Sequence, residues 1–225
     1  MDYRFGIEVS YNEFFTKMLK WMVKGVGVTF LTTIIMNVSQ LTSILAFVYY
    51  PVVIVCCIIE IAMVFILLKK INDLDFKSAL KYFYIYSVLN GITISFILAL
   101  IGPKLSILAF LITFVYFGLL YTIAKHSNSE FIGVGKICIS ALPILMIMYI
   151  VLMFINAPVL YYIVVLIDLA VFTGLTLYDL KKVRRVYESM TYEQTETMAL
   201  LCALELYLDF INIFLDIVML IADNN

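Results

Sequence analysis

Residues 198–221 read MALLCALELYLDFINIFLDIVMLI, and this stretch decides the fold class of the chain. It is an apolar run interrupted by a few acidic residues. It is long enough to cross a bilayer as an α-helix, which takes roughly 20 residues. A membrane barrel strand would instead alternate apolar and polar residues over about ten positions. The run is continuous, so we expect a membrane-spanning helix.

The rest of the chain has the same character. Of its 225 residues, 64% are hydrophobic and 14% are charged, whereas a soluble domain is about 45–50% apolar and about 25% charged. This composition excludes an ordinary soluble enzyme and a disordered chain. The net charge of −1, without an extended basic face, excludes a nucleic-acid binder. We therefore expect an integral membrane protein that has the lipid bilayer as a partner.

Seven apolar stretches follow one another along the chain. Ser10 and Glu13 have the spacing of a capping box, which predicts a short amphipathic helix at about 10–20. Pro103 falls beside the start of the fourth stretch, where proline is tolerated. No segment is left for a soluble domain. We therefore predict an all-α integral membrane protein with a single seven-helix domain over 1–225. The predicted spans are 21–48, 51–69, 79–101, 104–124, 133–155, 158–180 and 198–221.

Basic residues are distributed unequally between the two ends of these spans. Fourteen of the 15 Lys and Arg residues fall on one side of the membrane, and only Lys104 falls on the other. Cytoplasmic loops of membrane proteins are enriched in Lys and Arg. We therefore predict a cytoplasmic amino terminus and an external carboxyl terminus. The short tails carry no sorting signal, which favours a bacterial inner (plasma) membrane.

Signatures of known membrane enzymes are absent from the sequence. No Cys-x-x-Cys occurs and the only histidine, His126, lies at a helix end, which argues against a zinc site. The last stretch has no lysine to hold retinal, and no Gly-x-Gly-Asp motif of an intramembrane aspartyl protease is present. Two membrane aspartates would still be compatible with proteolysis, which stays an alternative. We predict a protein that is not an enzyme and has no cofactor.

Six acidic residues lie within the apolar stretches, where a charge at the centre of a helix costs at least about 2.5–3.5 kcal/mol. Only Lys24 is a base at comparable depth, so ion pairs cannot neutralise them all. Positions three or four residues apart share one helix face, and positions eleven apart are separated by about three turns. The last helix therefore carries a polar stripe, and the sixth helix carries another. The stripes consist of Glu205, Asp209, Asn212 and Asp216, and of Asp168 and Asp179, while Glu60 lies in the second span.

Three interpretations of these acidic stripes are open. Asp179 and Glu205 lie near the cytoplasmic interface, where simple hydration would explain them. The carboxyls could instead form a hydrogen-bonded cluster that holds protons. The third interpretation is a path for cations or protons, which intramembrane acids mark by default. The pattern favours this path for Asp209 and Asp179.

Several segments also carry a family resemblance. Leu177-Tyr178-Asp179, followed by a basic stretch, and LYLDFINIF at 206–214 are similar to the last two helices of the Bax inhibitor-1 family (transmembrane Bax inhibitor motif proteins). IEIAM at 59–63 resembles the second helix of that family, and NGIT at 90–93 resembles the third. The resemblance extends over nearly all seven helices, and the segment that begins LYLDFIN is the most specific part of it.

The resemblance implies a fold in which six helices in two layers surround a central seventh helix. It also implies a pH-sensitive calcium leak, with Asp179 and Asp209 as a paired sensor and Glu60 on the ion path. Some relatives carry an arginine late in helix seven, where this chain has Val218-Met219. A gate that uses that arginine is therefore not expected here. Family members are also regulators that bind other membrane proteins, including cell-death factors and a membrane protease, so a non-conducting regulator is the alternative.

The chemistry of a carboxyl pair is compatible with such a gate. Two carboxylates in a medium of low dielectric cannot both ionise cheaply, so they share a proton. A shared proton would bridge helices six and seven, whereas full ionisation would push the helices apart and create a hard oxygen site suited to Ca²⁺. Asp179 and Asp209 are thus the predicted sensor and possible Ca²⁺ ligands. The predicted ion path contains Glu60, Asp168, Glu205, Asn212 and Asp216.

Overall fold

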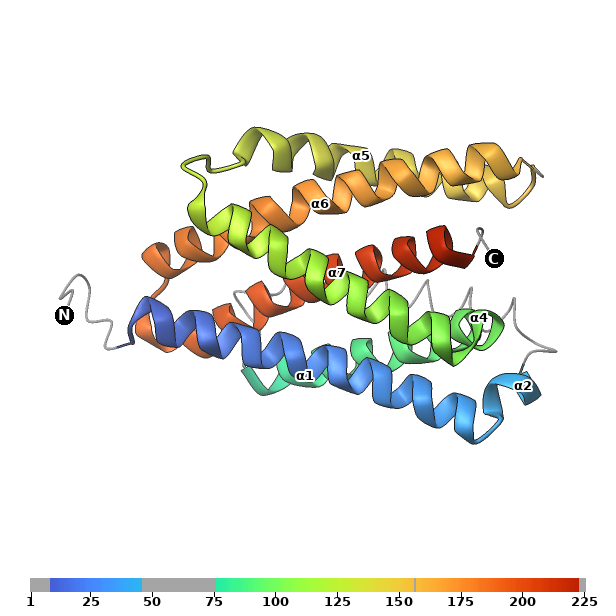
Figure 1. The fold of residues 1–225 in the computed structure, drawn as a ribbon. Coiled ribbons are helices and arrows are strands. Elements are labelled where there is room, and N and C mark those ends of the chain that lie inside the picture. The colour runs from blue at the N-terminus through green and yellow to red at the C-terminus, as the bar shows by residue number, and fades with distance from the viewer. Residues whose placement is uncertain (1–8, 46–75, 156, 223–225) are drawn as a thin grey trace. The chain divides into compact units, whose positions relative to one another are not determined.

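The structure is a computed structural model, and it describes residues 9–45, 76–155 and 157–222. Within these ranges the chain is helical and contains no β-strand, which confirms the predicted all-α class for this part of the chain. The helices are α1 (Tyr11–Val38), α2 (Leu41–Leu45), α4 (Phe76–His126), α5 (Ile132–Leu152), α6 (Pro158–Ser189) and α7 (Thr195–Ala222), with a 3₁₀ turn η2 at Tyr192–Gln194 (Figure 1).

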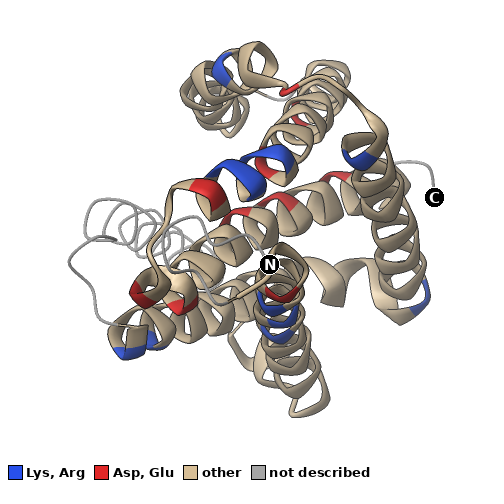
Figure 2. Ribbon diagram, turned by 90° about the vertical axis from the view of Figure 1, so that its left-hand side faces the viewer, with Lys and Arg blue, Asp and Glu red and all other residues tan. Residues whose placement is uncertain are grey.

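Five of the described helical segments are long and apolar enough to cross a membrane, namely α1, α4, α5, α6 and residues 192–222. Large apolar side chains are exposed on these helices. Leu100 on α4 and Val159 on α6, for example, are 84% and 74% exposed. Soluble proteins rarely expose extensive apolar surface, whereas lipid solvates it. Figure 2 shows that charged positions are separated by long uncharged stretches of helix. The chain is therefore an integral membrane protein.

Helix α4 consists of two helical halves. Gly102 interrupts it with φ 79° and ψ 166°, a conformation that glycine adopts without steric cost, and Pro103 follows without a backbone N–H to donate. A straight helix of 51 residues would be about 75 Å long, far more than the roughly 30 Å of a hydrocarbon core. The break therefore divides α4 into segments 76–101 and 103–126, close to the two predicted spans. The predicted span 51–69 lies outside the described residues, so the count of seven helices stays a prediction.

Helix α1 is longer than the predicted amphipathic helix. The capping box is present, because the Ser10 side chain accepts from the Glu13 N–H while the Glu13 side chain accepts from the Ser10 N–H. The helix then continues without a break through residue 21, where the sequence analysis placed the start of a separate span. No proline lies near that boundary and the helix continues through Gly25 and Gly27, so the amphipathic turn and the apolar run form one helix to Val38.

Helix α6 also extends beyond its prediction. Hydropathy ends the sixth span at residue 180, but the helix continues to Ser189. The additional turns contain the basic run KKVRR at 181–185. Lysine and arginine are good helix formers, so the helix continues after the apolar run has ended.

Helix α7 is the most deeply buried of the candidate spans. In its most apolar 18-residue window 72% of the residues are buried, compared with 17% to 33% in the other four. A helix that is apolar on most of its circumference and buried by protein is typical of the interior of a large helical assembly.

The chain forms two compact units. The first contains Met1–Pro103 and Tyr187–Tyr207, and the second contains Lys104–Val186 and Leu208–Asn225. Helix α4 passes from one unit to the other at its break, and α7 does so after Tyr207. A single domain over 1–225 would require the two units to pack together, and it stays a prediction.

In the first unit, polar side chains of α1 bond to backbone carbonyls of α4. The Thr29 and Thr33 hydroxyls donate to the Ser87 and Gly91 carbonyls at 3.0 and 2.9 Å, and Asn37 Nδ2 donates to the Ser95 carbonyl at 3.3 Å. Donors and acceptors both advance by four residues, so the two helices stay in register over two turns. In a bilayer such groups have no water to bond with, and hydrogen bonds between helices satisfy them instead.

Glycine makes this approach of α1 to α4 possible. A Cβ atom added at Gly91 would lie 2.6 Å from the Thr29 carbonyl oxygen and 2.6 Å from Thr32 Cβ. Both distances are below van der Waals contact, so any larger side chain would push α1 away. Small residues at helix crossings commonly have this role in membranes.

Tyr207 of α7 joins the same unit. Its hydroxyl lies 2.6 Å from Thr29 Oγ1, and its side chain is fully buried. The single Thr29 hydroxyl hydrogen is directed at carbonyls, so we assign Tyr207 as the donor to Thr29. The Tyr207 ring meets Phe83 and Tyr86 edge to face at 5.8 and 5.9 Å. The first turns of α7 are therefore anchored against α1 and α4.

In the second unit, α5 and α6 run side by side (Figure 1) and bury a shared apolar cluster. Glycines again allow close contact between helices. A Cβ atom added at Gly174 of α6 would lie only 2.6 Å from Cys138 Sγ of α5, and Gly135 of α5 lies against the Tyr178 ring of α6. The buried members of the cluster are Cys138, Leu145, Val164, Val171 and Leu175.

Candidate functional site: acidic residues of the transmembrane helices

The polar stripe predicted on the last helix lies on α7, and its members differ in burial. Asp209 and Asp216 are 3% and 4% exposed, whereas Glu205 and Asn212 are partly exposed. Asn212 Nδ2 donates to the Leu208 carbonyl of its own helix at 2.8 Å. Asp209, Asn212 and Asp216 belong to the second unit, and Glu205 belongs to the first. Two carboxyls of the stripe are therefore fully enclosed by protein.

The two acids of α6 also differ in burial. Asp168 is 9% exposed and Asp179 is partly exposed. Both lie in the second unit together with Asp209 and Asp216, so this unit contains four of the six predicted intramembrane acids. Glu60 lies outside the described residues. Lys24, the base expected at comparable depth, is on α1 with its Nζ 3.9 Å from the centre of the Trp21 ring.

Asp168 and Asp216 come together with a tyrosine of α5. The Tyr149 hydroxyl donates to Asp168 Oδ2 at 2.8 Å. The Asp216 carboxyl lies close enough to interact electrostatically with both Asp168 and Tyr149. Three helices thus contribute one polar group each to an otherwise apolar region. We refer to Tyr149, Asp168 and Asp216 as the lower acidic cluster.

Sequence reasoning missed Tyr149. Helices α5 and α6 are joined by the short connection 153–157. Tyr149 lies four residues before this connection and Asp168 lies eleven residues after it, so counting equal distances from the turn would not have paired them. No local sequence signal therefore identifies Tyr149 as the partner of Asp168.

Asp209 lies beside α5 as well. It lies close enough to interact electrostatically with the Cys138 side chain. Cys138 Sγ is also the atom that a Cβ added at Gly174 of α6 would contact, at 2.6 Å. One turn earlier on α5, Gly135 lies against the ring of Tyr178, which directly precedes Asp179. Asp209 and the 174–178 segment of α6 therefore both lie beside the turn of α5 that contains Gly135 and Cys138. A hydrogen bond between the Asp179 and Asp209 carboxyls stays a prediction.

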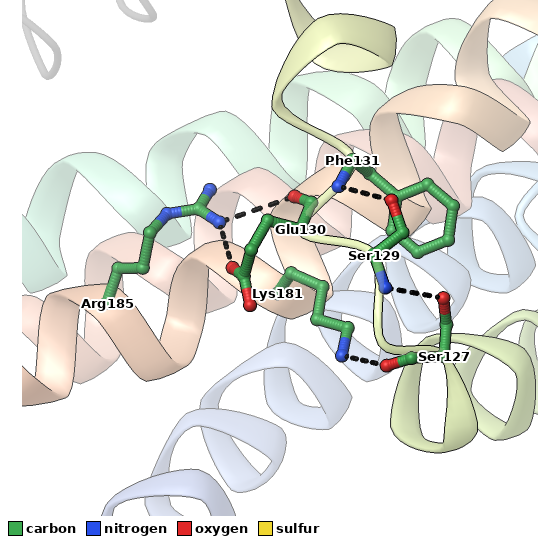
Figure 3. A network of polar contacts seen from close by, with 6 residues as sticks. All are labelled: Ser127, Ser129, Glu130, Phe131, Lys181 and Arg185. Atoms are coloured by element: carbon green, nitrogen blue, oxygen red, sulfur yellow. Dashed lines mark hydrogen bonds and ion pairs between the residues drawn. The ribbon is translucent and has the colours of Figure 1, made fainter.

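A polar network follows the Asp179 turn on α6 (Figure 3). Lys181 Nζ donates to the Ser127 carbonyl at 2.7 Å, and Arg185 forms an ion pair with Glu130 at 2.7 Å. The Arg185 guanidinium also lies 5.1 Å from the centre of the Tyr178 ring. The basic run thus joins the 127–131 connection between α4 and α5 to the turn of α6 that follows Asp179.

Metal-binding groups are sparse in the described part of the chain. Over these residues, no three His, Cys, Asp or Glu side chains are grouped so that they could hold a metal ion. A Ca²⁺ ion at Asp179 and Asp209 would therefore need further oxygen ligands, because Ca²⁺ takes six to eight. His126 lies at the end of α4, with its Nδ1 2.9 Å from the Thr122 carbonyl. The two cysteines of the described ranges, Cys138 and Cys202, are buried.

Comparisons with known proteins agree with the family resemblance. Residues 11–225 match the family described as "Inhibitor of apoptosis-promoting Bax1". An uncharacterized membrane protein of Streptococcus pyogenes serotype M1 is 29% identical over 224 residues, which cover 97% of this chain and 96% of that protein. An uncharacterized protein of Deinococcus radiodurans is 30% identical over 90% of this chain and 87% of its own length. The inner membrane protein YbhL of Escherichia coli K12 is 30% identical over 70% of this chain and 69% of its own length.

Proposed function

This chain belongs to the Bax inhibitor-1 family, and from that premise we propose that it is a pH-sensitive calcium leak channel of a bacterial inner membrane. A pair of carboxyls, Asp179 and Asp209, is the proton sensor that gates it. The protein is not an enzyme and needs no resident cofactor, and Ca²⁺ is the ion that passes through it. The location rests on relatives such as the Escherichia coli inner membrane protein.

The observation that carries the proposal is the burial of Asp209. Its side chain is 3% exposed on α7, the candidate span with the largest buried share. A carboxyl there has lost the water that would stabilise its charge, so only a proton, a cation or a strong donor makes its position tolerable. The burial of α7 also supports the proposed arrangement of seven helices in which the seventh is central.

The neighbourhood of α5 supports a pairing of Asp209 with Asp179. Asp209 lies near Cys138 of α5, and one turn earlier on α5 Gly135 lies against Tyr178, the residue that precedes Asp179. When the two carboxyls share one proton, they attract each other and hold α6 against α7. When both are ionised, they repel each other and offer hard oxygen ligands to a divalent cation. The number of bound protons thus selects between two helix packings, which is the requirement for a gate.

The ion path of this proposal follows the polar stripe of α7. Glu205, Asn212 and Asp216 would supply oxygens on one helix face, Asp168 of α6 lies beside Asp216, and Glu60 of the second span would complete the path. The amino terminus is cytoplasmic, because the basic residues gather on that side. The network of Lys181 and Arg185 would then lie at the cytoplasmic end of α6, where it keeps the turn beside Asp179 in place.

The experiment is Ca²⁺ flux into proteoliposomes that contain only this protein, measured across about pH 5–8, where a buried carboxyl would titrate. Asp179→Asn and Asp209→Asn keep the side-chain size and remove one titrating group each. Each variant should lose most of the pH dependence, and the double variant should add little, because members of one network are not additive. Glu205→Gln should change the pH dependence less than either aspartate variant, since Glu205 is a partly exposed acid on the same helix as Asp209.

Two results would contradict the proposal in different ways. If both single variants keep the wild-type pH profile, the carboxyl pair is not the sensor. If the wild-type protein gives no more flux than protein-free vesicles at any pH, the leak itself is wrong. The second result would favour the alternative, a non-conducting regulator that binds other membrane proteins such as cell-death factors or a membrane protease.

A further inference from the structure

A buried oxygen in the lower acidic cluster has no evident source of stabilisation. Asp216 is 4% exposed, and its Oδ2 atom has no hydrogen-bond partner among the residues that the structure describes. A buried carboxylate oxygen in that position would carry the full penalty of lost hydration. Membrane helices do not tolerate such a group unless something neutralises it.

Among the residues that the structure describes, the neighbours of Asp216 supply no positive charge. Asp168 faces it from α6 with a second carboxyl, and Tyr149 faces it from α5 with a hydroxyl. Tyr161 on α6 is a further titratable group beside the cluster, with its ring 6.4 Å from that of Tyr149. The segment 103–126 of α4 contributes Phe110 and Phe117 against Phe210. The bases of that segment are Lys104, Lys125 and His126, which lie at its two ends and are exposed.

Geometry distinguishes the roles of the two acids. The Tyr149 hydroxyl donates to Asp168 Oδ2 at 2.8 Å, and hydrogen bonds to an ionised acceptor are roughly twice as strong as neutral ones. The donor therefore stabilises the charged form of Asp168. Asp216 has no such donor on Oδ2 within the described ranges, so these surroundings favour the neutral form of this carboxyl.

We propose that Asp168 and Asp216 form a proton-binding site in which Asp216 holds the proton, Asp168 carries the charge, and Tyr149 positions Asp168. The ligand is a proton and not a metal ion, because no third acidic, His or Cys side chain joins the pair within the described ranges. The site is separate from the proposed sensor. Asp216 lies seven residues beyond Asp209 on α7, or about 10 Å along the helix axis. The inference stands on these contacts alone and does not rest on the proposed leak.

Infrared spectroscopy of the full chain in lipid tests this assignment, because a protonated carboxyl has a C=O stretching band that a carboxylate lacks. Aspartate labelled with ¹³C shifts the bands of Asp side chains away from those of Glu. At neutral pH, Asp216→Asn should lose one protonated-carboxyl band. In Asp168→Asn and Tyr149→Phe that band should persist but shift in frequency, since its neighbour has lost its charge or its donor. Asp209→Asn is the matched control and should leave the band in place.

A second measurement needs no variant. The apolar reagent dicyclohexylcarbodiimide reacts with protonated carboxyls inside membranes, and peptide mass spectrometry locates the product. We expect modification at Asp216 and not at the exposed, ion-paired Glu130. The proposal is overturned if Asp216→Asn retains every protonated-aspartate band of the wild type, or if the reagent does not modify Asp216. Both readouts are independent of ion flux, so a failure of the leak hypothesis would leave them unchanged.

Discussion

The contact between Thr29 and Tyr207 offers a quantitative test of how α7 is anchored in the first unit. Thr29→Val keeps the branched shape of the side chain and its low helix propensity, and it removes only the hydroxyl. Two hydrogen bonds between helices are lost, one from Thr29 to the Ser87 carbonyl at 3.0 Å and one between Thr29 and Tyr207 at 2.6 Å. Side-chain hydrogen bonds in membranes contribute about 0.6 kcal/mol on average and up to about 1.7 kcal/mol. We therefore expect the free energy of unfolding to fall by about 1–3 kcal/mol, taking two such bonds.

Thr32→Val is the matched control for this variant. The Thr32 hydroxyl donates only to the Val28 carbonyl of its own helix, at 2.9 Å. Its loss should change the free energy of unfolding by less than about 0.5 kcal/mol, as for a substitution away from a specific contact. The assay is reversible unfolding of the purified protein in mixed micelles, followed by the loss of helical circular dichroism.

A double-mutant cycle with Tyr207→Phe isolates the pair itself. Because Thr29 and Tyr207 contact each other, the double variant should lose less stability than the two single variants lose together, with a coupling of about 1 kcal/mol. Equal losses in Thr29→Val and Thr32→Val, together with additive effects in the cycle, would refute the inference that this hydrogen bond anchors α7.

Two further predictions concern packing and orientation. Gly91→Ala should destabilise the protein by about 1–3 kcal/mol, because a Cβ there would meet Thr29 and Thr32, whereas Gly118→Ala, which has nothing within 4 Å, should be neutral or slightly stabilising in the same unfolding assay. Cysteine labelling at Asn128 and Ala157, in the connections before and after α5, should occur from opposite sides of the membrane in a cysteine-free background. Labelling of both from one side would contradict the proposed topology.

Properties that depend on one segment at a time could be predicted from sequence. The helix over 198–221, the Ser10–Glu13 capping box and the helix break beside Pro103 all follow from hydropathy, turn chemistry and backbone sterics, and the structure contains each of them. Periodicity likewise placed Asp209 and Asp216 on one face of α7, because helical spacing is a property of the chain itself.

Hydropathy was a poorer guide to where helices begin and end. It measures transfer from water to lipid and is silent on whether a polar segment continues a helix. Helix α1 therefore absorbs the predicted amphipathic helix, and α6 continues to Ser189 through its basic run. These differences arise because helix propensity and lipid affinity are separate physical quantities.

The amino-acid sequence by itself determined that this protein is a helical membrane protein and that it belongs to a known family, and it predicted which carboxyls lie within the apolar spans. Only the tertiary structure decided which groups those carboxyls meet. Tyr149 donates to Asp168, Asp216 joins that pair, and Asp209 lies beside Cys138. Such contacts depend on the rotation and register of one helix against another. The rotation and register of two helices are set by the volumes of the side chains between them, including the space left open at Gly91, Gly135 and Gly174. No local pattern in a single segment encodes this fit.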